Sequence, residues 1–187
     1  MSSRTPRSIF LIGMMGSGKS TVGRLLAAGI GFEFVDADRE LEQRAGASVA
    51  TMFELEGETG FREREAHLLE ELTQRPGIVL ATGGGAILPD SSRQVLRSRG
   101  LVIYLQASAE EIARRTRGDL ARPLLQVSDR RARIEELLQQ RGPLYKQAAH
   151  LTVGSAAANP RRLVARLMVH PKVAAVSAAA AVGPPDP

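Results

Sequence analysis

The sequence predicts a doubly wound α/β protein with a mostly parallel sheet and helices on both of its faces. Short apolar runs of strand length alternate with segments in which apolar residues recur at helical spacing. A glycine-rich loop stands between the first apolar run and the first helical segment. The chain of 187 residues fits one domain, which we expect over residues 1–170.

The strands are predicted from short apolar runs, which are typical of strands buried on both faces of a parallel sheet. Asp36 closes the second run, and three glycines follow the third. The five expected strands span residues 9–12, 33–36, 78–81, 101–105 and 151–153.

The helices are predicted from apolar spacing and from end signals. Ser108 and Glu111 form a capping-box pattern, and Asn159-Pro160 resembles an N-cap followed by proline at the first helical position. A long helix should end near residue 149, with Gly142-Pro143 as a potential break. Further helices are expected at residues 19–29, 38–45, 48–56, 59–74 and 90–99, whereas residues 117–127 read as a charged loop and residues 171–187 as a frayed or disordered tail.

Composition excludes several classes of protein. Apolar residues make up 43% and charged residues 24%, which excludes a wholly disordered chain. No apolar run reaches the roughly 20 residues of a transmembrane helix, so we expect no membrane partner. The chain has no cysteine, which excludes disulfides, thiolate catalysis and cysteine metal sites and is compatible with the cytoplasmic location that we expect.

The net charge is +5, and 22 of the 25 basic residues are arginines. Two interpretations explain the excess of arginine equally well. One is a codon bias toward arginine, and the other is that some arginines bind planar anions through two parallel hydrogen bonds. The basic residues are scattered and aromatic residues make up only 4% of the chain, so we expect no nucleic-acid partner.

Residues 13–20 match the phosphate-binding pattern G-x-x-x-x-G-K-[ST] between a predicted strand and a predicted helix, which is the context that the motif requires. Glycines let consecutive N–H groups converge on a phosphate, and the helix N-terminus adds partial positive charge. Lys19 would reach the β- and γ-phosphates, and the hydroxyl of Ser20 can bind Mg²⁺. A chance glycine-rich turn is the alternative, and nucleotide binding is the stronger prediction.

Acidic residues follow the second predicted strand. Asp36 and Asp38 would face the phosphate loop, because ligands of such sheets bind beyond the carboxyl ends of the strands. One carboxylate can serve the metal while the other accepts a hydrogen bond from a substrate hydroxyl. The alternative is an ordinary helix N-terminus enriched in acids.

Three further groups of residues have both a functional and an ordinary interpretation. Gly83-Gly84-Gly85 would let a ligand approach the backbone, or form a plain turn. Arg62 and Glu65 stand three residues apart on a predicted helix, where they form either an aimed arginine or a surface ion pair. Arg122 lies in the charged loop, which is either a lid that meets phosphate or a solvated loop. The three histidines are isolated and are assigned no role.

Taken together in their order and spacing, these segments resemble the shikimate kinase family over about residues 8–168. The quoted segments are Gly-Met-Met-Gly-Ser-Gly-Lys-Ser at 13–20, Asp-x-Asp at 36–38, Phe61-Arg62-x-x-Glu65, the triplet 83–85, Arg122-Pro123-Leu124-Leu125 and Arg141-Gly142-Pro143-Leu144-Tyr145. The resemblance implies a P-loop kinase fold with five parallel strands in the order 2-3-1-4-5, a substrate-binding helical part at about residues 38–72 and a lid at about 117–127.

The resemblance also implies a reaction, in which ATP phosphorylates the 3-hydroxyl of shikimate with Mg²⁺ as cofactor. It places Lys19, Asp38 and Arg122 in catalysis, and it places the metal at Ser20 and Asp36. A monomer is expected. The implied nucleotide-binding residues are Gly16, Ser17, Gly18, Lys19, Ser20, Thr21, Arg115, Arg122 and Pro160, and the implied shikimate-binding residues are Asp38, Arg62, Gly83, Gly84, Gly85 and Arg141.

One position departs from the family pattern: Ala158 stands where some members have an arginine near the nucleotide. Two alternatives stay open at this point. Another small-molecule kinase of the same fold, such as a gluconate kinase, shares the phosphate loop. A nucleotide-binding module without catalysis would share it too, although such a module has no need of the whole set of charged residues.

Overall fold

The computed structural model describes residues 6–117, 123–154 and 159–181. Five parallel strands form one sheet in the order β2-β3-β1-β4-β5, as predicted. The strands are β1 (Ile9–Ile12), β2 (Glu33–Asp36), β3 (Ile78–Ala81), β4 (Leu101–Gln106) and β5 (Leu151–Gly154). The expected runs and the observed strands differ by one residue at most.

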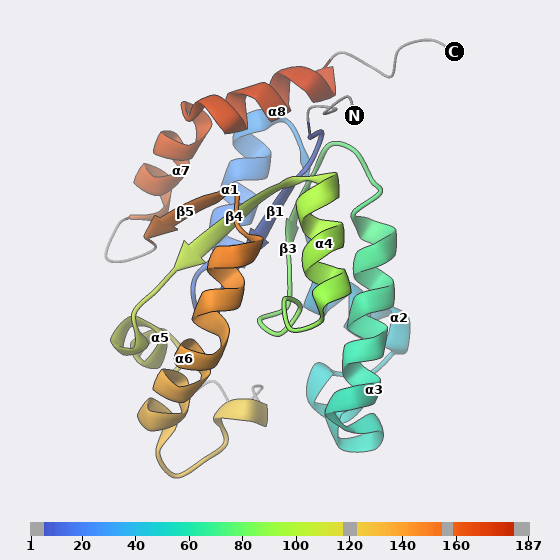
Figure 1. Ribbon diagram of the computed structural model, residues 1–187, viewed down its shortest axis with the longest axis vertical. Coiled ribbons are helices and arrows are strands. Elements are labelled where there is room, and N and C mark those ends of the chain that lie inside the picture. The colour runs from blue at the N-terminus through green and yellow to red at the C-terminus, as the bar shows by residue number, and fades with distance from the viewer. Residues whose placement is uncertain (1–5, 118–122, 155–158, 182–187) are drawn as a thin grey trace.

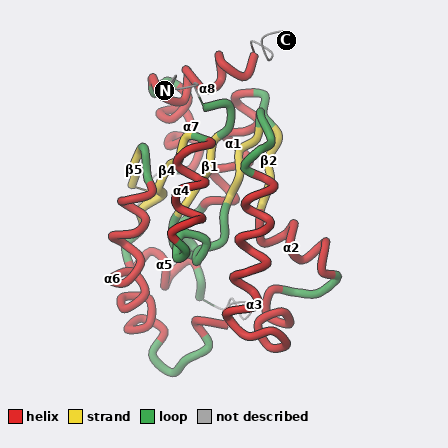
Figure 2. Tube along the Cα trace, turned by 45° about the vertical axis from the view of Figure 1, so that its right-hand side comes forward, coloured by secondary structure: helices red, strands yellow, loops and turns green. Residues whose placement is uncertain are grey.

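Helices cover both faces of the sheet (Figures 1 and 2). One face packs against α1 (Lys19–Ile30), α7 (Pro160–Met168) and α8 (Pro171–Ala181), and the other against α3 (Val49–Leu72), α4 (Asp90–Arg99) and α6 (Arg130–Ala148). The shorter elements are α2 (Ala37–Ala45), α5 (Ala109–Arg115) and the 3₁₀ turn η1 (Pro123–Leu125).

The central strand shows why two cores form. Phe10 and Ile12 belong to the core beneath α3, α4 and α6, whereas Ile9 and Leu11 belong to the core beneath α1, α7 and α8. Successive side chains of a strand point to opposite faces, so a strand buried on both faces must be apolar throughout. All four residues are fully buried.

The helix predictions are confirmed in detail at three places. The side chain of Ser108 accepts from the N–H of Glu111, and the reciprocal bond completes the capping box of α5. The side chain of Asn159 accepts from the N–H of Arg161 at the start of α7. Two helices are expected at residues 48–56 and 59–74. They form one kinked helix, α3, in which Gly57 has the non-helical angles φ 70° and ψ 179°. Glycine adopts this conformation without a Cβ penalty.

The expected break in the long helix is wrong. Helix α6 continues through Gly142-Pro143 to Ala148. Proline removes one helical hydrogen bond, but packing of Ile134, Leu137 and Tyr145, all buried, holds the helix across the missing bond.

The prediction of a frayed tail from residue 171 is also wrong. Residues 171–181 form α8, in which Val173 and Val176 are fully buried against the core beneath α7. The Nζ of Lys172 donates to the carbonyl of His150 at 2.7 Å, which ties α8 to the start of β5. Residues 182–187 lie outside the described part.

In the described part of the chain, no single helix is both long enough and apolar enough to cross a membrane. Helices α7 and α8 meet the length and composition criterion only as a pair, and they are bent by 68° relative to one another.

Candidate active site

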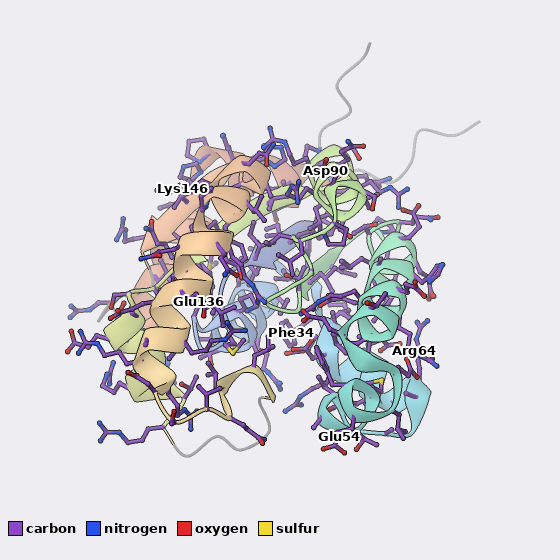
Figure 3. The ribbon with its side chains drawn as sticks, turned by 60° about the horizontal axis from the view of Figure 1, so that its bottom comes forward. Phe34, Glu54, Arg64, Asp90, Glu136 and Lys146 are labelled. Carbon is purple, nitrogen blue, oxygen red and sulfur yellow. The ribbon has the colours of Figure 1, made fainter. Side chains whose placement is uncertain are left out.

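The carboxyl ends of three neighbouring strands bring the predicted segments together. The phosphate loop follows β1, Asp36 ends β2, and Gly83-Gly84-Gly85 follows β3. In Figure 3, which views this end of the molecule, α6 lies on one side and α3 on the other. Two cavities lie there side by side, and Met15, Asp38 and Gly84 line both of them.

The first cavity, of about 360 Å³, is built around the phosphate loop. Gly13, Gly16 and Gly18 all have positive φ, a conformation that glycine adopts at little cost. The Nζ of Lys19 donates to the carbonyls of Gly13 and Met14, at 2.8 and 3.1 Å. The loop therefore holds its ammonium group at the mouth of α1, where a phosphate would meet it together with the helix N-terminus.

Most of the predicted nucleotide-binding residues line this cavity. The residues in question are Gly16, Gly18, Lys19, Ser20, Thr21 and Arg115. Ser17 is fully buried beside them, and its hydroxyl has no hydrogen-bond partner among the residues that the structure describes. Arg115 donates to the carbonyls of Gly16 and Ser17 at 3.2 and 3.3 Å, which holds its guanidinium against the loop. Pro160, at the start of α7, lines neither of the two cavities, and Arg122 lies outside the described residues.

The two predicted metal ligands are in direct contact. The hydroxyl of Ser20 donates to Oδ2 of Asp36 at 2.6 Å, and both residues line the phosphate cavity. A hydroxyl and a carboxylate are hard oxygen donors, which fit Mg²⁺ and leave its other positions for water and phosphate oxygens. The described residues contain no cluster of three or more His, Cys, Asp or Glu side chains suited to a metal.

The second cavity, of about 220 Å³, has apolar walls and a strongly charged floor. All six predicted substrate-binding residues line it. They are Asp38, Arg62, Gly83, Gly84, Gly85 and Arg141. The apolar walls come from Val49, Phe53, Phe61 and Leu124, and the carboxylates of Glu42 and Glu65 complete the lining.

Arg62 is aimed by a buried carboxylate. Its Nη1 donates to Oε2 of Glu65 at 2.7 Å, and its guanidinium lies over the rings of Phe53 and Phe61. Glu65 is only 2% exposed. Burial raises the pKa of this carboxyl, and Asp38 adds to the rise, whereas the charges of Arg62 and Arg141 oppose it. The pair is therefore not the surface ion pair that was the alternative interpretation.

Arg141 is a buried cation that has no acidic partner in the described part of the chain. It is 4% exposed, and its Nη1 donates to the carbonyl of Gly84 at 3.4 Å. Among the described residues no carboxylate forms an ion pair with it, and burial lowers the pKa of its guanidinium. A buried charge without a counter-ion is costly, so this side of the cavity is suited to an anionic ligand.

The glycine triplet is required by the charged side chains that rest on it. A Cβ at Gly83 would lie 2.0 Å from Oε1 of Glu65, and a Cβ at Gly85 would lie 2.2 Å from Cζ of Arg62. A Cβ at Gly84 would lie 3.2 Å from the backbone N of Met15 in the phosphate loop. Each glycine thus makes room for a different part of the site, which a plain turn would not require.

Sequence reasoning missed the apolar walls and one polar support. The sequence singles out Phe61 only as part of a family segment; it is buried and also lines the cavity. Tyr145 is fully buried and donates from its hydroxyl to the carbonyl of Gly84, next to Arg141. Its position four residues after Arg141 is the available signal, since side chains four apart lie on one helix face.

Comparison with known proteins decides the family. The family model described as shikimate kinase matches residues 15–170 of the chain. A shikimate kinase of Nitrosospira multiformis is 53% identical over 160 residues, which cover 86% of this chain and 82% of that protein. The chain belongs to the shikimate kinase family. A shikimate kinase of Methylococcus capsulatus is 50% identical over 165 residues, or 88% and 92% of the two chains.

A solved structure agrees with the fold as well. The shikimate kinase of Acinetobacter baumannii, determined in complex with shikimate, is 45% identical and has a TM-score of 0.86, with 88% of this chain and 92% of that chain covered. The activity of the chain is therefore that of a shikimate kinase, a phosphotransferase with an alcohol group as acceptor. Family membership at this level of identity decides against the gluconate kinase and against the module without catalysis.

Proposed function

We propose that the two cavities hold ATP and shikimate side by side and that the γ-phosphoryl group passes to the 3-hydroxyl of shikimate where the cavities meet. The observation that carries this proposal is Arg141, a buried cation with no acidic partner among the described residues, in a cavity that adjoins the phosphate loop. A carboxylate on the acceptor would supply the missing counter-charge. The Acinetobacter baumannii relative is solved in complex with shikimate, which supports the same acceptor here.

Arg62 and Arg141 would grip the carboxylate of shikimate from two sides. Arg62 is fixed by Glu65 and by two aromatic rings, so little side-chain freedom remains to be lost on binding. Gly84 would let the ring of the substrate lie against the backbone. The helices at about residues 38–72 would then form the substrate-binding part, as the resemblance implies.

Asp38 lines both cavities, which supports a role for it as the group that would receive the proton of the acceptor hydroxyl. The hydroxyl oxygen would form a bond to the γ-phosphorus, and the bond from that phosphorus to the oxygen bridging the β- and γ-phosphates would break. The proton would pass to Asp38, and ADP would leave with the bridging oxygen. Lys19 would stabilise the charge on the transferring group.

Mg²⁺ would be held by Ser20 directly and by Asp36 through water, and it would neutralise charge on the β- and γ-phosphates. The roles of Arg122, of a lid at residues 117–127 and of Pro160 at the adenine stay predictions from the resemblance. A monomeric cytoplasmic enzyme without nucleic-acid or membrane partners likewise stays a prediction.

The test is a coupled ADP-release assay with shikimate, gluconate and an analogue of shikimate whose carboxylate is a neutral amide, with and without Mg²⁺. We expect turnover of shikimate with Mg²⁺ and poor use of the other two acceptors. Arg62→Lys keeps the charge but loses the planar fork, and should lower kcat/KM for shikimate by about ten- to a hundredfold, or about 1.5–3 kcal/mol.

The matched control is Arg64→Lys, two residues along the same helix, where the side chain is 53% exposed and paired with Glu56. That variant should keep the parent kcat/KM. Equal use of shikimate and its neutral amide by the parent would show that the arginines do not grip a carboxylate.

A further inference from the structure

A cavity of about 510 Å³ lies outside the site described above, between the second half of α6 and the end of β4. It shares no lining residue with the phosphate cavity or the acceptor cavity. Its volume is in the range of small-molecule sites, about 300–1,000 Å³. The residues that define its chemistry are Tyr104, Gln106, Leu138, Gln139, Pro143 and Lys146.

The lining combines apolar surface with one positive charge. The ring of Tyr104, Leu138 and Pro143 are apolar, and Lys146 is the sole charged residue among the lining residues. No hydrogen bond or ion pair engages the ammonium group of Lys146 within the described part of the chain. Figure 3 shows Lys146 on α6, nearer the C-terminal end of the helix than Glu136.

The same stretch of α6 lacks one helical hydrogen-bond donor. Pro143 has no N–H, so the carbonyl of Gln139 receives no helical hydrogen bond from that position. Gly142, also in the lining, has no side chain to cover it. The cavity therefore offers a cation and side-chain amide groups around an apolar surface.

We propose that this cavity is a second ligand site, for a small organic anion with an apolar body, and that its occupancy is coupled to the acceptor cavity. The anionic group would lie at Lys146, and the apolar body would lie against Leu138, Pro143 and the ring of Tyr104. A neutral ligand would leave Lys146 without a counter-charge, and a cation would be repelled.

A short chain of contacts connects the two cavities. The ring of Tyr104 stacks on the ring of Tyr145, with centroids 5.0 Å apart and an interplanar angle of 16°. The hydroxyl of Tyr145 donates to the carbonyl of Gly84, which also accepts from Arg141. Gly84 and Arg141 line the acceptor cavity. The coupling, though not the binding itself, rests on the proposed function of Arg141.

The direction of the coupling follows from the weakness of this turn of α6. Glycine in a helix interior and a missing helical hydrogen bond leave this turn less restrained by its own backbone than the rest of α6, so packing has to hold Arg141 and Tyr145 in place. A ligand packed against Gly142 and Pro143 restricts the turn and orders Arg141 before shikimate arrives. Shikimate then pays less ordering entropy and binds more tightly, and by reciprocity shikimate tightens the anion.

The probe for binding is 8-anilino-1-naphthalenesulfonate, a fluorescent organic anion with an apolar body, titrated with the full-length protein in the presence of saturating ADP and shikimate, a pair that the enzyme cannot turn over. Gly142→Leu is the decisive variant. A Cβ at Gly142 meets no atom within 4 Å, and its φ is not positive, so the new side chain enters the open space without strain. We expect its dissociation constant for the probe to rise at least tenfold.

Lys146→Gln should raise the dissociation constant by about three- to tenfold, the effect of losing one exposed ion pair with some surrounding contact. The control is Arg131→Gln on the same helix, 72% exposed and outside the cavity, which should bind the probe as the parent does. Thermal melting of each variant shows that it is folded. Unchanged probe binding by folded Gly142→Leu, or displacement of the probe by shikimate or ATP, would overturn the site.

The coupling is read from KM values in the ADP-release assay. Saturating probe should lower the KM for shikimate two- to fivefold in the parent and leave it unchanged in Gly142→Leu. Probe binding with an unchanged or raised KM would overturn the coupling. Failure of the parent to bind shikimate in calorimetry would instead overturn the proposed function, while leaving the measured probe binding intact.

Discussion

Replacing Gly85 by alanine should disable shikimate recognition without altering the nucleotide site. The added Cβ would lie 2.2 Å from Cζ of Arg62 and 2.3 Å from each of its terminal nitrogens. Non-bonded heavy atoms rest at about 3.5–4.0 Å, so the guanidinium must move by more than about 1 Å. That movement takes Arg62 out of line with Glu65 and with the place proposed for the carboxylate of shikimate.

The magnitude follows from the contact that is lost. A hydrogen bond to a charged group contributes about 1.5–3 kcal/mol, which is roughly ten- to a hundredfold in kcat/KM for shikimate. The affinity for ATP should change little, because Gly85 does not line the phosphate cavity. The assay is ADP release at varied shikimate, with ATP binding measured separately by calorimetry in the absence of shikimate.

Two controls separate this effect from general damage. Gly154→Ala is the matched substitution, since a Cβ there meets no atom within 4 Å and its φ is not positive. In a double variant with Arg62→Lys, the loss caused by Gly85→Ala should shrink, because both changes act on the same contact. Full additivity of the two losses, or a kcat/KM within threefold of the parent for Gly85→Ala alone, would refute the reasoning.

Three other outcomes are expected. Asp38→Asn should lower kcat at least a hundredfold and leave ATP affinity within about twofold, because the amide keeps the shape and loses the charge; much weaker ATP binding in calorimetry would instead place Asp38 on the metal. Burial raises the pKa of Glu65 above its ordinary value, and Glu65→Gln mimics the protonated acid, so the parent's advantage in kcat/KM over this variant should shrink toward one as the pH falls and Glu65 becomes protonated. Removing residues 171–187 should lower the free energy of unfolding by about 3–6 kcal/mol, because Val173 and Val176 are 0% and 1% exposed and each fully buried valine contributes about 1.5–3 kcal/mol; an unchanged urea midpoint would contradict the docking of α8.

The sheet and the phosphate loop could be predicted from the sequence because their signals are local. An apolar run of four residues, a glycine pattern and a terminal aspartate each report on a neighbourhood of a few residues. The parallel topology then brings the residues that follow these strands together, because the carboxyl ends of β1, β2 and β3 lie at one edge of the sheet. Ser20 and Asp36, sixteen residues apart in the sequence, meet at 2.6 Å for this reason.

The acceptor cavity could not be derived in the same way. Arg62 lies on α3 and Arg141 on α6, and the spacing of either helix alone does not say which side faces the other. The family resemblance supplied these residues, whereas the structure supplies the reasons for their neighbours. The need for glycine at 83 and 85 comes from side chains of Glu65 and Arg62, far from the turn itself, and no local pattern reports such a contact.

The tail was misread because its two signals point in opposite directions. Its position at the end of the chain and its prolines favour a frayed end, whereas its alanines favour a helix. Val173 and Val176 are three residues apart and therefore share one helix face, which is enough to dock a short helix onto the core. The burial of these two valines against the core therefore favours the helix over a frayed end.

Burying unpaired charges in the acceptor cavity costs free energy, and the proposed substrate would offset that cost. Arg141 is buried there, and among the described residues Arg141 has no acidic partner and the Nε of Arg62 has no hydrogen-bond partner. A stable core would not keep these groups, since each unsatisfied buried polar atom costs about 1–3 kcal/mol. A carboxylate entering between the two arginines would satisfy the charges that the fold leaves unbalanced. The same arrangement explains why the glycine triplet is needed, because only a backbone without side chains leaves room for three charged groups and a ligand at one edge of the sheet.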